Sequence, residues 1–386
     1  MKTPGKLARR IAAYILVALL SSSVTYMLCQ HQNGKLIELR NLLENRYIGG
    51  VEQDVLDEAA AKAMVSAVGD PWSYYIPAES FEARQLQSEN AYVGIGVTIR
   101  NREDGQGIDI IQVEPESSAQ KNGILPGDIL VEVEGQSVRA LGIEGTQKLI
   151  KGDVGTKVKL GVLRDGQRMD LTVTRSKIKR TVVSGKMLDG DIGLIRINNF
   201  NERCAEEGKA AVKTLIEQGA KALIFDVRYN PGGRVNEMTA LGDYLLPEGV
   251  LFQSEDYRGK KETTRSDADC VELPMAVLIN GSSYSAAEFF AAALREYDWA
   301  TVVGTATSGK GYFQQVYELC DGSGVGLSVG RYYTPKGVSL AEAGGLVPDV
   351  TVEVDEETAA LIYSGSLDPA EDPQIQAAVK VLREKA

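Results

Sequence analysis

The stretch NGSSYSAAEFF, Asn280 to Phe290, places three serines on a glycine turn between an apolar run and a helix-like run. A serine presented at such a turn can act as a nucleophile only if a base removes its proton. The single histidine, His31, lies far away beside an apolar N-terminal segment, so another base is needed. Taken alone, Ser285 followed three residues later by Glu288 is more often a helix-capping box than a nucleophile.

A second stretch, VRYNPGGRV, ends an apolar strand in a turn with two adjacent glycines, Gly232 and Gly233. Glycines let backbone N–H groups approach a ligand closely, which is the architecture of an oxyanion hole for a carbonyl oxygen that gains negative charge. As a lone motif NPGG is weak, and a structural turn is its default interpretation.

A third stretch, TSGKGYFQQ, carries Lys310 between Gly309 and Gly311. With histidine excluded, a lysine can serve as the base if burial favours its neutral amine. Most of the 42 Lys and Arg residues are expected to be solvated surface charges, so position alone does not identify Lys310.

The elements that must position these residues follow a βα pattern from Met187 onward. Apolar strands such as KALIFDV and PMAVLIN alternate with helical runs, which predicts an α/β core with both sheet faces covered. The run VYELCDGSGVGLSVGRYYTP predicts a hairpin, and DPQIQAAVKVLREK predicts a closing amphipathic helix.

From Tyr92 to about Ile178, short β runs and two helical runs predict a small, partly open barrel, with a hairpin at the Asp-Gly of LRDGQRM. This unit resembles a PDZ domain through YVGIGV and NGILPGDILVEVEGQSV. The resemblance implies a loop whose N–H groups bind a chain-terminal carboxylate while the peptide adds to a sheet edge. Its expected residues are Tyr92, Val93, Gly94, Ile95 and Gly96. For GIG alone a tight turn would be the simpler interpretation.

The only long apolar run, Ile11 to Leu28, follows Lys2, Lys6, Arg9 and Arg10. It has about the length that spans a bilayer, with the basic flank in the cytoplasm. A cleaved signal peptide and a buried core helix are the alternatives. We expect a single-pass cell-membrane protein whose catalytic part lies on the extracytoplasmic side. Helical patterns follow between Lys35 and Val68, and their apolar stripes are expected to pack on the rest of the chain or on a second copy.

Composition excludes several functions. The formal net charge of −11 and the pI near 4.9 argue against a nucleic-acid surface. Four cysteines without CxxC spacing and one histidine make a metal site improbable. Cys270 and Cys320 either form a disulfide in an oxidising compartment or remain free thiols.

Together the three stretches resemble the carboxyl-terminal processing peptidases, which are serine proteases with an inserted PDZ domain. The resemblance runs from about Lys35 to the C-terminus and includes DPWSYY, YVGIG, FDVRYNPGG, NGSSYSAAE, TSGKGYFQ, YYTPKG and GGLVPDV. It implies Ser285 as nucleophile, Lys310 as base and Gln314 as the residue that orients the lysine. It also implies the N–H of Ala286 and of Gly232 or Gly233 as oxyanion donors, and no cofactor.

The chain departs from the family pattern at Tyr284 and Ala287, and at Tyr229, where asparagine is common in the family. Tyr284 is expected to narrow the site, which puts substrate preference in question more than chemistry.

The expected fold is an α/β protease core of crotonase-like or ClpP-like βα units with an inserted PDZ domain, an N-terminal helical region and a transmembrane anchor. Its predicted parts are a cytoplasmic tip and membrane anchor (residues 1–32), an N-terminal helical region (33–88), the PDZ domain (89–178), the protease core (179–355) and a C-terminal helical segment (356–386).

The leading hypothesis is a membrane-anchored endopeptidase that binds protein or peptide substrates through their C-termini and forms a homo-oligomer, with a dimer favoured. One alternative is a catalytically silent PDZ scaffold or chaperone that binds protein tails. Such a protein would be expected to lose the nucleophile, the base or the oxyanion glycine, and this chain keeps all three. A thioester-directed acyl-transfer enzyme of crotonase-like shape is a third reading, which explains neither the PDZ unit nor the anchor.

Overall fold

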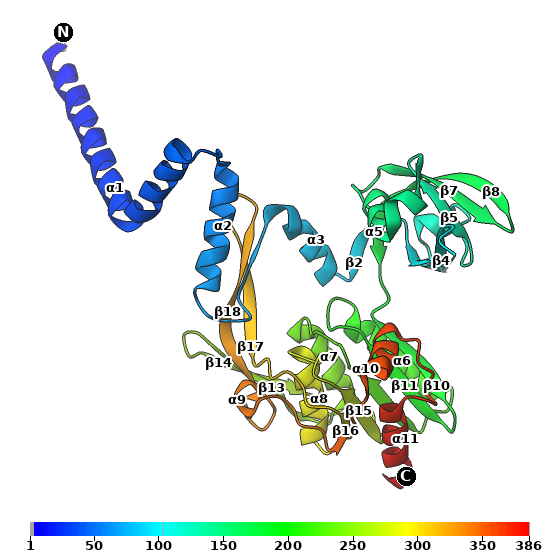
Figure 1. Cartoon of the computed structure of the whole chain (residues 1–386). Helices are drawn as coiled ribbons and strands as arrows, with labels where there is room; N and C mark the ends of the chain where they lie inside the picture. Colours follow the sequence, from blue (N-terminus) through cyan, green and yellow to red (C-terminus); the bar gives the residue numbers. More distant parts are fainter. Residues whose placement is uncertain (1–3, 103, 386) are drawn as a thin grey trace. The chain divides into compact units, whose positions relative to one another are not determined.

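The computed structural model describes residues 4–102 and 104–385 (Figure 1). The chain divides after Pro77 into two compact units. The first unit holds two long helices and a short strand, and the second holds the barrel and the α/β core.

The first unit contains α1 (Pro4–Arg46), α2 (Gln53–Ser66) and β1 (Tyr74–Ile76). The apolar run Ile11 to Leu28 lies within α1, but the side chains at positions 12 and 23–33, including His31, are outside the described residues. Among the described residues, no helix combines the length and apolarity needed to cross a membrane. The predicted transmembrane anchor therefore has no support from the structure.

The predicted small barrel is present in the second unit. Its strands pair in the order β3-β4-β5-β7-β8, with β6 beside β5. Their bounds are β3 (Val97–Asn101), β4 (Ile108–Val113), β5 (Ile129–Val133), β6 (Gln136–Ser137), β7 (Lys157–Arg164) and β8 (Gln167–Thr174). Two helices, α4 (Ser118–Lys121) and α5 (Val138–Ile150), complete it. Asp165 and Gly166, with φ of 51° and 78°, form the predicted tight turn between β7 and β8.

The chain enters and leaves this barrel along one two-stranded ribbon. After α3 (Ala78–Ser88), β2 (Ala91–Gly94) pairs antiparallel with β9 (Ser176–Lys179). The strands by which the chain enters and leaves the barrel therefore lie side by side.

The α/β core is built on a six-stranded sheet in the order β10-β11-β12-β15-β16-β19, in which only the β10–β11 pair is antiparallel. The strands are β10 (Val183–Leu188), β11 (Ile192–Ile197), β12 (Ala222–Asp226), β15 (Met275–Ile279), β16 (Ala300–Gly304) and β19 (Val350–Thr351). The continuous apolar runs of β12 and β15 are fully buried, as expected for parallel strands covered on both faces.

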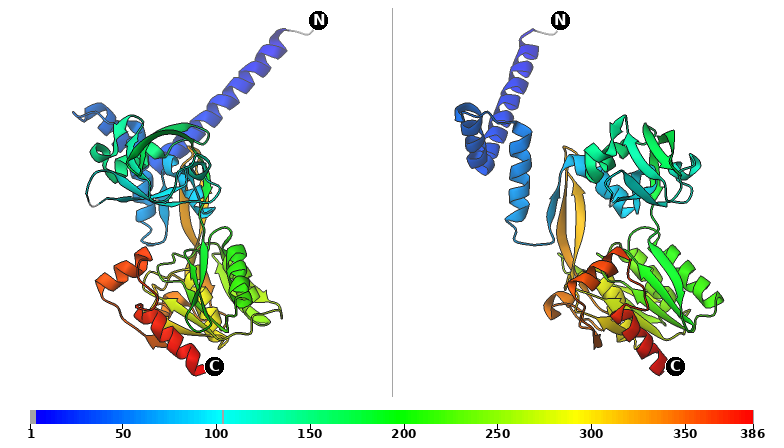
Figure 2. Two further views of the ribbon diagram at one scale, coloured as in Figure 1. Left: turned by 90° about the vertical axis from the view of Figure 1, so that its right-hand side faces the viewer. Right: turned by 45° about the vertical axis from the view of Figure 1, so that its right-hand side comes forward.

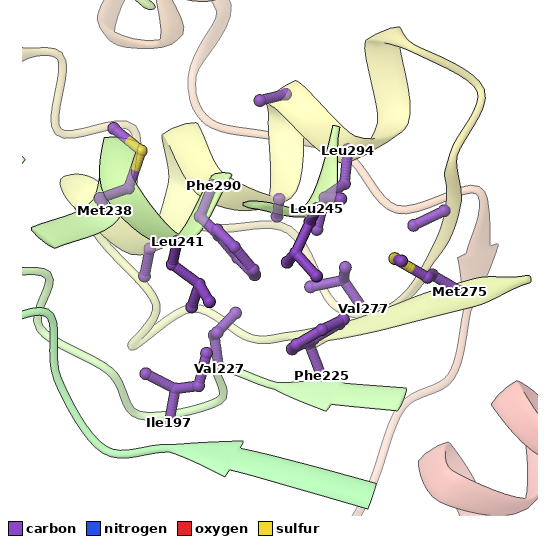
Figure 3. Packing of buried hydrophobic residues seen from close by; sticks show 14 of the residues in the cluster. Ile197, Phe225, Val227, Met238, Leu241, Leu245, Met275, Val277, Phe290 and Leu294 are labelled. Carbon is purple, nitrogen blue, oxygen red and sulfur yellow. The ribbon is translucent and has the colours of Figure 1, made fainter. Parts of the chain in front are cut away.

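Alternate residues of these strands belong to two separate cores. Phe225 and Val277 pack toward α6 (Cys204–Glu217), α7 (Val235–Leu245) and α8 (Ala286–Glu296) (Figure 3). Ile224 and Leu278 pack on the opposite face toward α11 (Pro373–Lys385). The period of two along each strand thus assigns every residue to one helical layer or the other.

The ring of Phe290 anchors α8 on the first of these faces. It lies 5.6 Å from the Phe225 ring and 5.3 Å from the Phe200 ring, centroid to centroid. Burying such a side chain stabilises a fold by about 1.5–3 kcal/mol. The packing fixes the start of α8, which is the part of the helix that matters for chemistry.

A second, antiparallel sheet contains β13 (Gly249–Asp256), β14 (Lys261–Ser266), β17 (Tyr312–Glu318) and β18 (Gly324–Tyr333). The predicted hairpin is β17–β18, drawn in yellow to orange in Figure 2. The short helices α9 (Leu340–Ala343) and α10 (Glu356–Ser364) follow it.

Cys204, Cys270 and Cys320 are free thiols, so the structure contains no bond between Cys270 and Cys320. Cys204 is fully buried, and this burial raises the pKa of its thiol well above the usual range. It is a core residue rather than a reactive thiol.

Candidate active site

Ser285 stands at the start of α8 in a strained backbone conformation, with φ of 59° and ψ of −127°. A positive φ is uncommon for a residue other than glycine and persists only when the surroundings hold it. The residue is 9% exposed. This strain, at a turn between β15 and α8, is typical of functional sites.

The neighbouring serines have other roles. The Ser283 hydroxyl is fully buried, donates to the carbonyl of Val227 at 2.7 Å and accepts from the N–H of Asn280 at 3.0 Å. It therefore ties the turn to the end of β12. Ser282 is exposed, and its N–H donates to the side-chain oxygen of Asn280 at 3.1 Å. Of the three, Ser285 is the serine at the helix start.

Glu288 joins the serine turn to the lysine loop. One carboxylate oxygen accepts from the N–H groups of Ser285 and Lys310 at 2.7 and 2.9 Å. The other accepts from the Thr307 hydroxyl and the Gly309 N–H at 2.5 and 2.7 Å. The predicted reach of Glu288 back to the helix start is confirmed, but its connection to the lysine loop was not predicted.

The Glu288 side chain is completely buried. Burial raises the pKa of this carboxyl above its usual range, although the hydrogen bonds from Thr307, Gly309, Ser285 and Lys310 oppose the shift. The only sequence signal for this role was a glutamate three residues after a serine, which a helix cap explains equally well.

Gly232 touches the turn before α8 directly. A Cβ atom at this position would lie 2.8 Å from the Cβ of Ser285 and 2.9 Å from the backbone nitrogen of Ala286. Its φ of +84° also favours glycine. The turn is held by buried Asn230, whose backbone carbonyl accepts from the N–H of Tyr284 at 3.1 Å.

Gly232 and Gly233, the two candidate oxyanion glycines, are held by different contacts. The Gly232 N–H donates to the side-chain oxygen of Asn230 at 2.8 Å, so it is turned toward the asparagine. Gly233 forms an isolated bridge with Phe200, and a Cβ there would lie 2.3 Å from the Phe200 carbonyl carbon. The N–H of Ala286 is at the first position of α8, where no earlier carbonyl of the helix can accept it.

Lys310 lies in a loop that packs closely on α9 and on the residues directly after it. A Cβ at Gly309 would lie 2.9 Å from the Gly345 nitrogen, and one at Gly311 would lie 2.8 Å from the Ala341 Cβ. Glycine at both positions therefore allows the two backbone segments to approach closely.

The Lys310 amine lies 5.8 Å from the centroid of the Tyr284 ring, within the range of a cation–π contact. This contact brings the amine beside the residue that directly precedes Ser285.

Gln314 lies on β17. Its amide nitrogen donates to the Ser328 hydroxyl at 3.0 Å and to the Tyr312 carbonyl at 3.3 Å. These bonds fix the orientation of the amide, while its predicted role in orienting Lys310 stays a prediction.

A buried ionic cluster supports the NPGG turn, and it was not among the features predicted from the sequence. Arg228 binds both carboxylate oxygens of Asp226 at 2.9 and 2.7 Å and also contacts Asp372 at 2.9 Å and Gln374 at 2.9 Å. Burial opposes the charge of Arg228, but Asp226 and Asp372 more than offset it and hold its pKa above the usual range. Charged residues directly after a buried strand were the available signal. No sequence pattern indicated that Asp372, near the C-terminus, would join them.

The predicted PDZ loop lines a cavity of about 690 Å³ together with β3 and α5. Ile95 is buried in the barrel core, and Gly96 has a φ of +87°. A Cβ at Gly96 would lie 2.3 Å from the Ser117 Cβ. We call this cavity the peptide groove.

Comparison with known proteins agrees with this architecture. Residues 191–352 match Peptidase family S41, and residues 93–174 match the PDZ domain. The chain is 33% identical over 325 residues to the carboxy-terminal processing protease CtpA of Bacillus subtilis, covering 83% of this chain and 69% of that protein. It is 31% identical over 305 residues to the chloroplastic carboxyl-terminal-processing peptidase 2 of Arabidopsis thaliana, covering 75% of this chain and 59% of that one.

A solved structure from Bacteroides fragilis, described as an S41 protease, shares the fold with a TM-score of 0.54 at 16% identity, over 85% of this chain and 90% of its own. The chain therefore belongs to the S41 family of carboxy-terminal processing serine proteases and carries a PDZ domain.

Proposed function

We propose that this protein is an endopeptidase that cuts polypeptides with Ser285 as nucleophile and Lys310 as base, and that its PDZ domain engages their C-termini. The observation that carries the proposal is the buried Glu288 carboxylate, which binds the backbone of both residues. Two chain segments that are distant in sequence are thereby held in one arrangement, as a nucleophile and its base require.

The proposed reaction begins when the neutral Lys310 amine takes the proton of the Ser285 hydroxyl as that oxygen attacks a peptide carbonyl. The oxyanion that forms is stabilised by the N–H groups of Gly233 and Ala286, because the Gly232 N–H donates to Asn230. Lysine then gives its proton to the leaving amine, and an acyl-enzyme remains. Water, deprotonated by Lys310, releases the acyl group and restores the serine.

Gln314 is proposed to orient Lys310 through its amide, which Ser328 holds in place. Tyr284 is proposed to narrow the site, because its ring lies beside the Lys310 amine. Neither residue gives or accepts a proton in the proposed reaction.

Hydrolysis of an unstructured protein, followed by mass spectrometry of the fragments, tests the proposal. Ser285→Ala should abolish cleavage, and Lys310→Arg should not support it because a guanidinium stays protonated. His31→Ala should be as active as the wild-type chain. A Lys310→Arg enzyme with near-normal turnover would contradict the dyad. Tail binding without cleavage by the wild-type chain would instead favour the silent scaffold.

A homodimer is proposed from the first unit. Leu36, Leu39 and Leu42 of α1 are each about half exposed, at 49%, 51% and 48%. Spaced by three residues, they share one face of the helix, which a second copy could cover. Light scattering of the wild-type chain and of Leu39→Glu should show a dimer and a smaller species, respectively.

Location at the cell membrane, with the catalytic part outside the cytoplasm, is a proposal carried by the basic flank and the apolar run Ile11 to Leu28 alone. Protease added to spheroplasts should degrade the body of the protein. Protection of that body would contradict the proposal.

A further inference from the structure

The peptide groove contains a cation that comes from outside the PDZ domain. Its charged lining residues are Glu114, Lys151 and Arg180. Arg180 directly follows β9, where the chain leaves the barrel and enters the protease core. It also lies beyond residues 93–174, which match the PDZ domain.

Arg180 reaches the carboxylate-binding loop through an aromatic ring. Its guanidinium carbon lies 4.6 Å from the centroid of Tyr92. The same ring lies against Gly94, where a Cβ would be 3.0 Å from the Tyr92 Cε2 atom. Gly94 and Arg180 therefore both contact the Tyr92 ring, and the planar cation shares the lining of the peptide groove with Gly94 and Gly96.

The backbone of Arg180 is fixed at both of its polar groups. Its N–H donates to the Asn90 carbonyl at 2.8 Å, and its carbonyl accepts from Arg203. Arg203 also donates to the Glu89 carbonyl at 3.2 Å and to Glu207 at 3.1 Å, at the start of α6. Asn90 before β2 and Arg203 at the start of α6 thus hold the Arg180 backbone, while the Tyr92 ring holds its guanidinium.

We propose that Arg180 binds the terminal carboxylate of the polypeptide in the peptide groove, as the charged partner of the Gly94–Gly96 loop. This inference rests on the C-terminus recognition of the proposed function. A guanidinium can bind a carboxylate through two parallel hydrogen bonds. Glu114 on the same groove repels an anion, so a cation is needed to offset it. Lys151 supplies only a point charge without that fork.

The position of Arg180 also defines where the bound tail leads. Arg180 and Tyr92 line a second cavity of about 1000 Å³, which extends to Pro231 of the NPGG turn. A chain end held by Arg180 therefore lies where the peptide groove meets the cavity beside the proposed oxyanion donors. Recognition of the tail and delivery of the chain share one residue.

Binding of a labelled peptide tests the assignment. The Ser285→Ala protein, which should not cut its ligand, is titrated with a fluorescent peptide ending in valine and with the same peptide amidated at its C-terminus. The free carboxylate should bind roughly tenfold more tightly than the amide, since hydrogen bonds between charged groups are the stronger ones. Arg180→Gln should remove most of this preference.

Lys179→Gln is the matched control, because Lys179 is an exposed cation one residue away that lines neither cavity. It should keep the full preference. Arg180→Lys keeps the charge and can keep a cation–π contact with Tyr92, but it lacks the planar fork, so it should keep part of the preference. Melting temperatures of the variants check that each is folded. If Arg180→Gln lowers stability, the Arg180→Lys variant still tests the role of the guanidinium.

The outcomes separate two failures. Equal binding of the free and amidated peptides by the Ser285→Ala protein would overturn C-terminus recognition itself. A clear preference that Arg180→Gln retains in full would overturn only the role of Arg180.

Discussion

The N–H of Ser285 donates to the carboxylate of Glu288 at 2.7 Å, and the same oxygen atom of Glu288 binds the lysine loop. Because Glu288 is completely buried, water cannot replace these bonds if they are lost. Loss of the Glu288 carboxylate is therefore expected to disturb the strained serine turn and the lysine loop together.

Glu288→Gln should reduce turnover by more than tenfold and lower the free energy of unfolding by about 1–3 kcal/mol, because an amide nitrogen cannot accept from buried N–H groups. Peptide hydrolysis and urea unfolding measure the two effects. Glu206→Gln, at an exposed position in α6, should change neither. Wild-type turnover in Glu288→Gln would show that the bonds of Glu288 do not position the serine turn and the lysine loop for the reaction.

The stability conferred by Glu288 should depend on pH. Burial raises its folded-state pKa above the usual value of 4.5. At a pH between the two pKa values the folded chain holds a proton that the unfolded chain has lost, so the free energy of unfolding falls as pH rises through this window. Glu288→Gln removes the titration. The difference in unfolding free energy between wild type and variant should decrease as pH rises from 4.5, and an increase would contradict the raised pKa.

Gly232→Ala should nearly abolish reaction of Ser285 with a small serine-directed fluorophosphonate probe. The new Cβ would meet the Ser285 Cβ at 2.8 Å and the Ala286 nitrogen at 2.9 Å. Gly337→Ala is the control, because Gly337 has a similar φ of +81° with no atom within 4 Å of the added Cβ. It should cost about 1–2 kcal/mol of stability through backbone strain and leave the labelling rate unchanged. Equal labelling of both variants would show that Gly232 does not shape the site.

Arg228→Met should destabilise the chain by about 3–5 kcal/mol, because it leaves Asp226 and Asp372 buried without their cation. Lys221→Met removes the exposed ion pair with Asp191, formed at 2.8 Å, and should change stability by less than about 1 kcal/mol. Thermal and urea unfolding compare the two. A similar small loss for both would mean that the buried cluster does not hold the C-terminal helix to the sheet.

The sequence by itself was sufficient for the features that depend on local patterns. The alternation of β12 and β15 with helices predicted the α/β core, because buried parallel strands must be continuously apolar. Asp165–Gly166 predicted a hairpin turn from the left-handed backbone it needs. The apolar run in α1 predicted a membrane span in the same way, and this prediction has no support in the described residues.

The tertiary structure decided the features that depend on contacts between distant segments. Ser282, Ser283 and Ser285 are chemically alike in the sequence, and only packing assigns Ser283 to the Val227 carbonyl and Ser285 to the strained helix start. In the same way, the short-range pattern around Glu288 is fully explained by a helix cap, while its bonds to the lysine loop exist only after folding.

Arg228 shows the physical reason most directly. Asp226 is two residues away and visible in the motif, but Asp372 is 144 residues away. No local pattern links them, because a buried charge is satisfied by whichever carboxylate the packing of α11 on the sheet brings within reach. Local propensity determines which elements form, whereas the burial of polar groups determines which residues must meet.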